Sequence, residues 1–435
     1  MDSQSLLVRV ERLENRVIEV ERQNLELRKQ NADLKRRLLA YENAHTPPSK
    51  SKKKRLPKDE PSGKLGAPLG HEKYERQQPV PTSTVEHELG SCSNCGNKLG
   101  KPFMTERRII EDIPEPKPIK ATEHLIHHYI CSCCGKKNVA PHSLPKGFFG
   151  ANAETTTVLL RFEDRLPLRK VVNALQRQNL NVSNVCVQNI SNRVARQLLP
   201  EYNAQIRLLR VSPVVSADET EMPVNGKTYW LWTFTTEHLT VYTIQKRRNS
   251  AVPIEILGKQ YNGIVTSDGH TAYKKIGSAQ QRCWAHIIRE SKELNAEHKL
   301  YAPHHDNIKK IFAKIKQTRA NPPPLEKRVE LKKQLETKTT QIADALDGHK
   351  EYRTFAIKLR NAIPALFTCI IHLFVEPTNN AAERALRELI VLRKITGGLR
   401  RKTGARTLET IATMLTTWKQ QEKPLYPTLK QAING

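Results

Sequence analysis

The chain has 435 residues, 38% of them hydrophobic, and it carries 72 Lys and Arg against 44 Asp and Glu. This length and apolar content exclude a peptide-like module, because they allow two or three domains and at least one buried core. The net charge of +28 favours a phosphate-rich partner, and nucleic acid is the natural one.

The sequence also indicates the compartment. Residues 1–5 do not open a signal peptide, and we find no apolar run long enough to span a bilayer. We therefore expect an intracellular protein without a membrane partner. The eight cysteines are then expected to bind metal or to stay as free thiols, since disulfides are rare in that compartment.

Residues 1–44 show a heptad repeat. One heptad position holds Val10, Val17, Asn24, Asn31 and Leu38, and the position three residues further on holds Leu6, Leu13, Val20, Leu27, Leu34 and Tyr41. The pattern predicts a coiled-coil dimerisation helix, in which two Asn of the seam select the register and a low oligomer number. We expect a parallel homodimer. The alternative is one amphipathic helix that packs on its own chain.

Residues 45–81 lose this period and are rich in Pro, Gly and Lys. The composition is typical of a flexible linker, which in this chain is basic. Its run "KSKKKR" could contact phosphates, but such runs are more often only solvated.

Two Cys-x-x-Cys knuckles follow in residues 82–149. They are Cys92 and Cys95 in "CSNCG", and Cys131 and Cys134 in "CSCCG". In each knuckle the Gly allows a tight turn that points backbone amides at the thiolates. Four thiolates suit one closed, tetrahedral, structural Zn²⁺ site, so we predict a zinc ribbon. The fourth donor stays open, because Cys133 could replace its neighbour Cys134.

Residues 150–210 have the composition of a folded helical unit. We predict a helix at 168–177, a short polar break, and a second helix that Ser183 caps and that runs to about 199. Arg193 and Arg196 would lie on this second helix. A helix-turn-helix of this kind is compatible with docking in the major groove of DNA. Many such helical pairs only pack, so that interpretation is open as well.

Strand patterns begin after residue 211. "VSPVVSA" ends in Asp218, and "KTYWLWTFTT" and "LTVYTIQ" follow as two further alternating segments, which predicts an antiparallel meander. A helix is expected at 251–260. The short apolar strand 264–266 then leads to Asp268, and "QRCWAH" is expected to be another strand. Two aspartates therefore stand at or just past the ends of neighbouring strands.

A third carboxylate, Glu383, stands at the head of a basic segment. From Arg384 to Arg406 the sequence has eight Lys or Arg and a single acid. A simple explanation is that Asn379 or Asn380 caps a surface helix whose first turns contain Glu383.

A second explanation is a metal site. A strand-end Asp, a second strand-end Asp and a Glu on a later helix are the arrangement by which an RNase H-like α/β core brings three carboxylates to two divalent cations. Reaction at a phosphodiester uses two such cations, and oxygen ligands suit Mg²⁺ or Mn²⁺. We predict Asp218, Asp268 and Glu383 as the ligands, with DNA held by the basic residues nearby. The candidates for phosphate contact are His286, Arg393, Lys394, Arg400, Arg401 and Lys402.

The last two acids are 383 − 268 = 115 residues apart, far more than one connecting helix requires. Residues 291–372 have amphipathic patterns broken by "NPPP" and "DGHK", which predicts an all-helical insertion domain. The RNase H-like catalytic core would then comprise 211–290 and 373–435. For the insertion, a DNA-facing role and packing support for the core are both open.

Several segments resemble the transposases of the insertion-sequence 66 family, which belong to the DDE group. After the two knuckles come, in order, "SADETEMPV", "TSDGHTAY", "RCWAHIIRE", "PTNNAAERALR", "RKITGGLRRKTGAR" and "TTWKQQEKPLYP". The resemblance implies that the three acids are catalytic and that small accessory proteins of the same element are partners. It also implies a role near the active site for Cys283, Trp284 and His286, for which a buried strand is the alternative.

We therefore predict a DNA transposase that cleaves strands at the ends of its element, at terminal inverted repeats, and joins the released 3′ hydroxyl to target DNA. Asp218 would bridge both metal ions, and Asp268 and Glu383 would each complete one. The alternative is a transposase-derived DNA-binding regulator that keeps the fold but is catalytically idle. We expect the protein in the cytoplasm of a bacterium, associated with the nucleoid.

Overall fold

The computed structural model describes residues 80–434 apart from 113–114, 143, 145–146 and 299–300, together with nine residues between 16 and 31. The described residues of the predicted coiled coil are helical and exposed, among them Val20 and Leu27 of the seam. The rest of that segment, and the basic linker up to residue 79, lie outside the described residues. The parallel dimer therefore stays a prediction.

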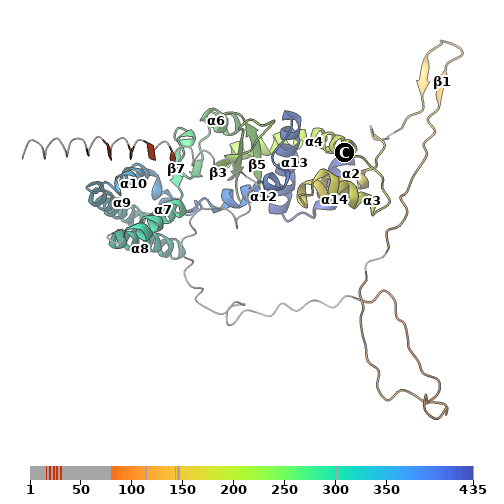
Figure 1. Ribbon diagram of the computed structural model, residues 1–435. Coiled ribbons are helices and arrows are strands. Elements are labelled where there is room, and N and C mark those ends of the chain that lie inside the picture. Colours follow the sequence, from red (N-terminus) through yellow and green to blue (C-terminus); the bar gives the residue numbers. More distant parts are fainter. Residues whose placement is uncertain are drawn as a thin grey trace, which may run out of the picture.

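The centre of the molecule is a five-stranded mixed sheet of order β5-β4-β3-β6-β7 (Figure 1). Its strands are β3 Val214–Glu221, β4 Trp230–Thr235, β5 Thr240–Gln245, β6 Ile264–Ser267 and β7 Ala279–Arg282. β3, β4 and β5 pair antiparallel, which confirms the predicted meander, whereas β6 pairs in parallel with β3 and β7. The core is thus mixed α/β, and its strand order is compatible with an RNase H-like fold.

Helices cover both faces of the sheet. They are α5 Leu199–Arg210 and α6 Ala251–Leu257 on one face, and α12 Asn380–Thr396 and α13 Lys402–Gln420 on the other. Successive side chains of a strand point to opposite faces, so Trp232 packs on the first pair of helices and Leu231 on the second. β4 and β5 are buried on both faces, which explains their nearly continuous apolar sequences.

α13 also covers the open edge of β5. Three polar side chains, spaced four residues apart along one side of the helix, accept hydrogen bonds from alternate backbone N–H groups of the strand. The pairs are Glu409 with Ile244, Thr413 with Tyr242, and Thr417 with Thr240. An exposed strand edge is a template for pairing with other chains, and these bonds close it within one chain.

Glu409 makes the stability of the protein depend on pH. Burial raises the pKa of its carboxyl from about 4.5 to about 7, although the N–H of Ile244 acts in the opposite direction. The folded state therefore holds a proton that the unfolded state releases, and the contribution of Glu409 to stability falls as pH rises between these two values. Glu409→Gln keeps the acceptor without the charge, so we expect this fall to be absent from the variant.

Urea unfolding at pH 5.5 and pH 8 measures the effect. We expect Glu409→Gln to be at least as stable as wild type at pH 8. Glu409→Leu leaves the N–H of Ile244 unpaired and is expected to cost about 1–3 kcal/mol at both values. A Gln variant that loses more stability at pH 8 than at pH 5.5 would contradict the assignment.

A helical unit precedes the sheet in sequence. It consists of α2 Ala151–Val158, the π-helical turn η1 Leu159–Glu163, α3 Leu168–Gln176 and α4 Asn184–Gln197. The two predicted helices and the Ser183 cap are confirmed, since the hydroxyl of Ser183 accepts the N–H of Cys186 at 3.2 Å. The unit shares an apolar core with α13 and with α14 Leu425–Asn434, so it packs on the C-terminal helices of the chain.

The chain between β7 and α12 is helical, as predicted. Its helices are α7 Trp284–Glu297, α8 Ala302–Ala320, α9 Leu325–Asp347, α10 Arg353–Leu366 and α11 Thr368–Ile371. They lie at one end of the sheet (Figure 1) and share an apolar core with it, to which Ile264 of β6 and Trp284 of α7 both belong. The insertion therefore supports the core by packing, one of the two roles left open by the sequence.

One segment of the insertion corrects the expectation that no apolar run is long enough to span a bilayer. By length and composition alone Arg353–Ile371 could cross a membrane, but half of this apolar stretch is buried inside the protein. Its apolar side chains, such as Phe355 and Leu359, belong to the core of the insertion. The apolar run is explained by this burial.

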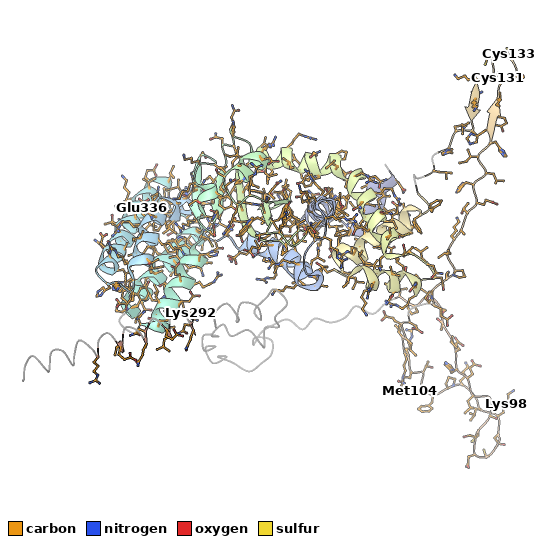
Figure 2. All side chains as sticks on the ribbon, turned by 45° about the horizontal axis from the view of Figure 1, so that its top comes forward. Lys98, Met104, Cys131, Cys133, Lys292 and Glu336 are labelled. Carbon is orange, nitrogen blue, oxygen red and sulfur yellow. The ribbon has the colours of Figure 1, made fainter. Side chains whose placement is uncertain are left out.

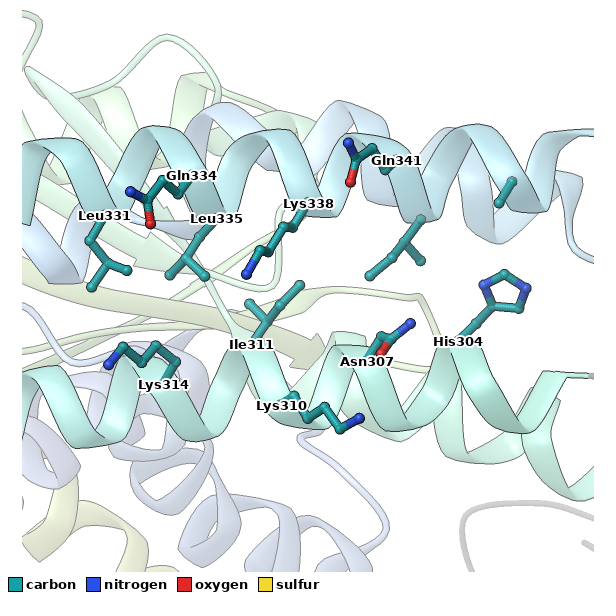
Figure 3. A pocket seen from close by; sticks show the side chains of 12 residues that line it. His304, Asn307, Lys310, Ile311, Lys314, Leu331, Gln334, Leu335, Lys338 and Gln341 are labelled. Atoms are coloured by element: carbon teal, nitrogen blue, oxygen red, sulfur yellow. The ribbon is translucent and has the colours of Figure 1, made fainter.

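α8 and α9 leave a groove between them of about 570 Å³ (Figure 3). Ile311 and Leu335 lie on its apolar floor, and three lysines line it: Lys310, Lys314 and Lys338. In the part of the chain that the structure describes, none of these lysines pairs with a carboxylate, since the ion pairs of α8 and α9 involve other lysines and arginines. This positive charge is compatible with the DNA-facing role of the insertion.

Candidate active site

The two aspartates lie on neighbouring strands at the centre of the sheet. The parallel pairing of β3 and β6 ends with Ser216 opposite Thr266, and Asp218 and Asp268 follow two residues further along each chain. Because paired parallel strands advance together, this register puts the aspartates side by side. Asp268 directly follows the last residue of β6, as predicted.

Asp218 does not end its strand, which corrects the sequence prediction. β3 continues to Glu221 because its last residues pair with the start of β4. β6, on the other side, has ended by then. Asp218 thus lies where one neighbouring strand stops and the other continues, and its carboxylate Oδ1 accepts the N–H of Glu219 at 2.9 Å.

Glu383 lies in the first turn of α12, and a buried amide determines where that helix begins. Asn379 stands at the N-cap and Glu383 in the first turn, as the simple capping explanation expected, but the side chain of Asn379 makes no cap bond. Instead its Nδ2 donates to the carbonyl oxygen of Ala217 at 2.8 Å, and the residue is fully buried. This bond ties α12 to β3 one residue before Asp218, and so holds the helix that carries Glu383 next to the strand that carries Asp218.

The charges of the other two acids act on Asp218, although the ligand atoms of the three do not all lie within 4.8 Å of one another. Burial, followed by the charges of Asp268, Glu219 and Glu383, raises the pKa of Asp218 to about 7, against the N–H of Glu219. Carboxylates that repel one another in a partly buried place fit a cation, which removes the repulsion. Glu383 Oε1 is moreover buried without a hydrogen-bond partner. A buried oxygen with no donor is what a metal-ligand atom is expected to be in the metal-free protein.

The segment expected as a last strand is divided between a strand and a helix. β7 ends at Arg282, Cys283 is the N-cap of α7, and Trp284 and His286 lie in its first turn. Trp284 belongs to the core and donates its indole N–H to the carbonyl of Leu366 at 2.7 Å. The prediction of a strand is therefore wrong from Cys283 onward, because Trp284 is buried by helix packing rather than by sheet pairing.

Cys283 and His286 nevertheless face the acids. A ligand atom of each lies within 4.8 Å of a carboxylate oxygen of Glu383, and this is the one such group of three in the described part of the chain. His286 Nδ1 is 3.8 Å from Glu383 Oε1. Burial raises the pKa of the Cys283 thiol. Its sulfur accepts the N–H of Asn379 at 3.1 Å, so Cys283 is a second buried contact of the residue that ties α12 to β3.

Sequence reasoning missed two residues beside the acids. Arg289 lies 3.9 Å from Glu383 Oε2, and its position three residues after His286 on α7 is a helical spacing that could have indicated it. Glu219 stands next to Asp218, and its side chain is only 1% exposed. Nothing in the sequence signals that burial, since Glu is rarely buried.

The predicted phosphate contacts fall into two groups. Lys394, Arg400, Arg401, Lys402 and Arg196 are exposed. Arg393 instead donates to the backbone carbonyl of Glu221 and is half-buried. Arg193 forms an ion pair with the buried carboxylate of Glu154. The guanidinium groups of Arg393 and Arg193 are thus held inside the protein, where they stabilise the fold.

The two cysteine knuckles have the same local geometry. In each, the N–H of the Gly donates to the carbonyl of the first Cys at 2.9 Å, and the Gly φ is positive, at 75° for Gly96 and 68° for Gly135. Backbone amides lower the pKa of Cys92, led by that of Cys95, and the pKa of Cys131, led by that of Cys134. Each turn thus presents amides to its thiol, as predicted.

The structure does not bring the two knuckles together. β1 His128–Ile130 and β2 Lys137–Val139 form a hairpin around the second knuckle, at one end of an extended arm. Lys98, just past the first knuckle, lies far from Cys131 at the other end (Figure 2). Within the described residues the four cysteines form no metal-binding group, so the zinc ribbon stays a prediction.

Comparison with known proteins shows what this arrangement is similar to. A protein of Sinorhizobium fredii described as "Uncharacterized protein y4jD" is 24% identical over 211 residues, which cover 44% of this chain and 41% of that protein. The chain thus spans less than half the length of this relative. Residues 146–407, from the helical unit through the three acids into α13, match the family described as "Transposase IS66 family". Because the match covers more than half of the chain, and includes Asp218, Asp268 and Glu383, the chain belongs to the IS66 family of transposases.

Proposed function

We propose that this protein is a DNA transposase of the DDE group, which cleaves DNA strands at the ends of its element and joins them to target DNA with the help of divalent metal ions. The observation that carries the proposal is the placement of three acids that are distant in sequence: the pairing of β3 with β6 sets Asp218 beside Asp268, and the Asn379 bond holds the helix of Glu383 against β3. The family supports transposition. The net charge of +28 supports DNA as the substrate.

The three acids would hold two Mg²⁺ or Mn²⁺ ions, with Asp218 shared between them and Asp268 and Glu383 each completing one site. When bound, these ions supply stabilisation of the attacking and leaving oxygens at a phosphodiester. The chain itself fixes the ligands. N–H groups of Glu219 and His270 orient the two aspartates, at 2.9 and 2.7 Å from their Oδ1 atoms.

The basic residues would hold the DNA. His286 and Arg289 flank Glu383 at 3.8 and 3.9 Å, close enough to reach a phosphate at the acids. Four exposed candidates follow and would position the flanking DNA backbone: Lys394 on α12, Arg400 and Arg401 between the two helices, and Lys402 at the start of α13. Such contacts carry no base information, and their affinity falls with salt.

The test is incubation of the purified protein with DNA that carries the ends of its element. Nicking that requires Mg²⁺ and those ends supports the transposase. Retarded mobility without nicking supports the idle DNA-binding regulator. If neither effect is seen, only a structural scaffold is left.

Light scattering of the same preparation is expected to give the mass of a homodimer formed through residues 1–44. Accessory proteins of the element, added to the assay, are expected to increase the yield of strand transfer.

We also propose that the two knuckles hold one structural Zn²⁺. Their amide-lined thiols support this, because such thiols ionise more easily and thiolates are the zinc ligands. Metal analysis of the purified chain is expected to give one zinc per chain. Cys92→Ser, Cys131→Ser and Cys134→Ser should each remove it.

The control is Cys186→Ser, since Cys186 lies on α4 away from the knuckles, and it should retain the metal. Cys133→Ser should retain it too, which would settle the fourth ligand in favour of Cys134. A wild-type chain purified without chelator that contains no zinc would exclude the site.

A further inference from the structure

We propose that Glu219 is a positioning residue that holds both active-site aspartates, so that its loss weakens metal binding although it is not itself a metal ligand. The inference rests on the proposed function, because it takes Asp218 and Asp268 as metal ligands. It is carried by the contacts of one buried side chain and its own backbone N–H.

Glu219 contacts Asp218 through the backbone. Its N–H donates to Asp218 Oδ1 at 2.9 Å. The two side chains are successive in β3 and therefore point to opposite faces of the sheet. The carboxylate of Glu219 thus lies behind the metal site, where it is 1% exposed and cannot join the other acids.

Two donors fix this buried carboxylate. The hydroxyl of Tyr273 donates to Oε2 at 2.5 Å, and Nε of Arg248 donates to Oε1 at 3.0 Å. Arg248 is itself held over the ring of Trp230 at 4.2 Å. A buried charge needs such partners, and here they come from the segments after β5 and after β6.

The contact with Tyr273 matters because this residue closes the loop that begins with Asp268. The short 3₁₀ turn Thr271–Tyr273 ends the loop. Within it, the N–H of His270 donates to Asp268 Oδ1 at 2.7 Å, and His270 Nδ1 lies 3.6 Å from Glu219 Oε1. The carboxylate of Glu219 therefore ties the loop that orients Asp268 to the strand that carries Asp218.

The loop also packs against Arg282 at Gly269. Gly269 has a φ of 90°, and a Cβ at this position would clash with the side chain of Arg282. The loop therefore has a packing contact with Arg282 that does not involve Glu219. Loss of the Glu219 contact leaves this packing in place, and should loosen Asp268 without unfolding the sheet.

Glu219→Gln tests the proposal, with Glu221→Gln as the matched control, because Glu221 lies on the same strand and is exposed. Gln keeps one oxygen for Arg248, but an amide N–H then replaces the oxygen that accepts from Tyr273, and the negative charge that strengthens both bonds is lost. We expect the dissociation constant for Mn²⁺, measured by electron paramagnetic resonance without DNA, to rise about 10–100-fold. Hydrogen exchange of amides 268–273 should become faster. Glu221→Gln should match wild type in both.

Tyr273→Phe is the second variant, in case Glu219→Gln does not fold. It removes one hydroxyl and should move both readouts in the same direction by a smaller factor. Unchanged Mn²⁺ affinity and unchanged exchange in folded Glu219→Gln or Tyr273→Phe would overturn the proposal. If wild type binds Mn²⁺ and Asp268→Asn does not, yet no DNA is cleaved, the proposed function fails while the role of Glu219 is still tested.

Discussion

Asp218→Asn, Asp268→Asn and Glu383→Gln are each expected to lower the rate of strand cleavage by about a thousandfold or more, with little change in DNA affinity. Each substitution keeps the size of the side chain and removes the charge that would hold a cation. DNA contacts come from other, basic side chains, so binding should persist. Single-turnover cleavage of labelled end DNA, together with fluorescence anisotropy for affinity, measures both quantities.

Stability provides an independent check on the same variants. The pKa of Asp218 is raised to about 7 by burial and by its acidic neighbours, so its ionised form is disfavoured in the metal-free protein. Asp218→Asn should therefore raise the melting temperature of the metal-free protein at pH 8. Glu221→Gln is the control and should leave both cleavage and melting unchanged. Cleavage at the wild-type rate in any of the three acid variants refutes the catalytic assignment.

Asn379→Asp is expected to cause the second-largest loss. The new carboxylate oxygen faces the carbonyl of Ala217 where Nδ2 donated at 2.8 Å, in a place that is fully buried. We expect a cost of about 1–3 kcal/mol in unfolding free energy. We also expect a fall in cleavage of about 10–100-fold, because the start of α12 shifts and moves Glu383 away from Asp218.

Asn380→Asp is the matched control for this tether. Asn380 is the next residue and is exposed, and an acid in the first turn of a helix is favourable for the helix dipole. Chemical unfolding and single-turnover cleavage of both variants separate the two roles. Equal effects at both positions would mean that Asn379 acts only at the start of the helix. The proposed role of its bond to Ala217 in holding α12 on β3 would then be refuted.

The parts of the fold that follow from local pattern could be predicted from the sequence. The meander was predicted because β3, β4 and β5 alternate or are apolar throughout, and the helical pair because Ser183 is a strong cap before an amphipathic run. The helical insertion followed from a spacing too long for one connection. These features depend on residues close together in the chain, so a single sequence contains the information.

The features that the sequence did not predict depend on partners far away in the chain. "QRCWAH" suits a strand or a buried helix start, and only the packing of Trp284 on the insertion decides between them. Arg193 has the position of a DNA contact, yet Glu154 pairs with it inside the protein. A basic side chain has the same sequence signal in both situations.

The sequence by itself determined which acids could share a metal site, and the order of the segments that carry them. Only the tertiary structure decided where those acids lie: the register of β3 and β6 sets Asp218 beside Asp268, the amide of Asn379 holds the helix of Glu383 against β3, and the carboxylate of Glu219 contacts Tyr273 of the loop that follows Asp268. The physical reason is that the type of side chain, here a carboxylate, is read from a single position of the sequence. The place of that side chain in the fold depends instead on buried hydrogen bonds between residues as much as 162 positions apart.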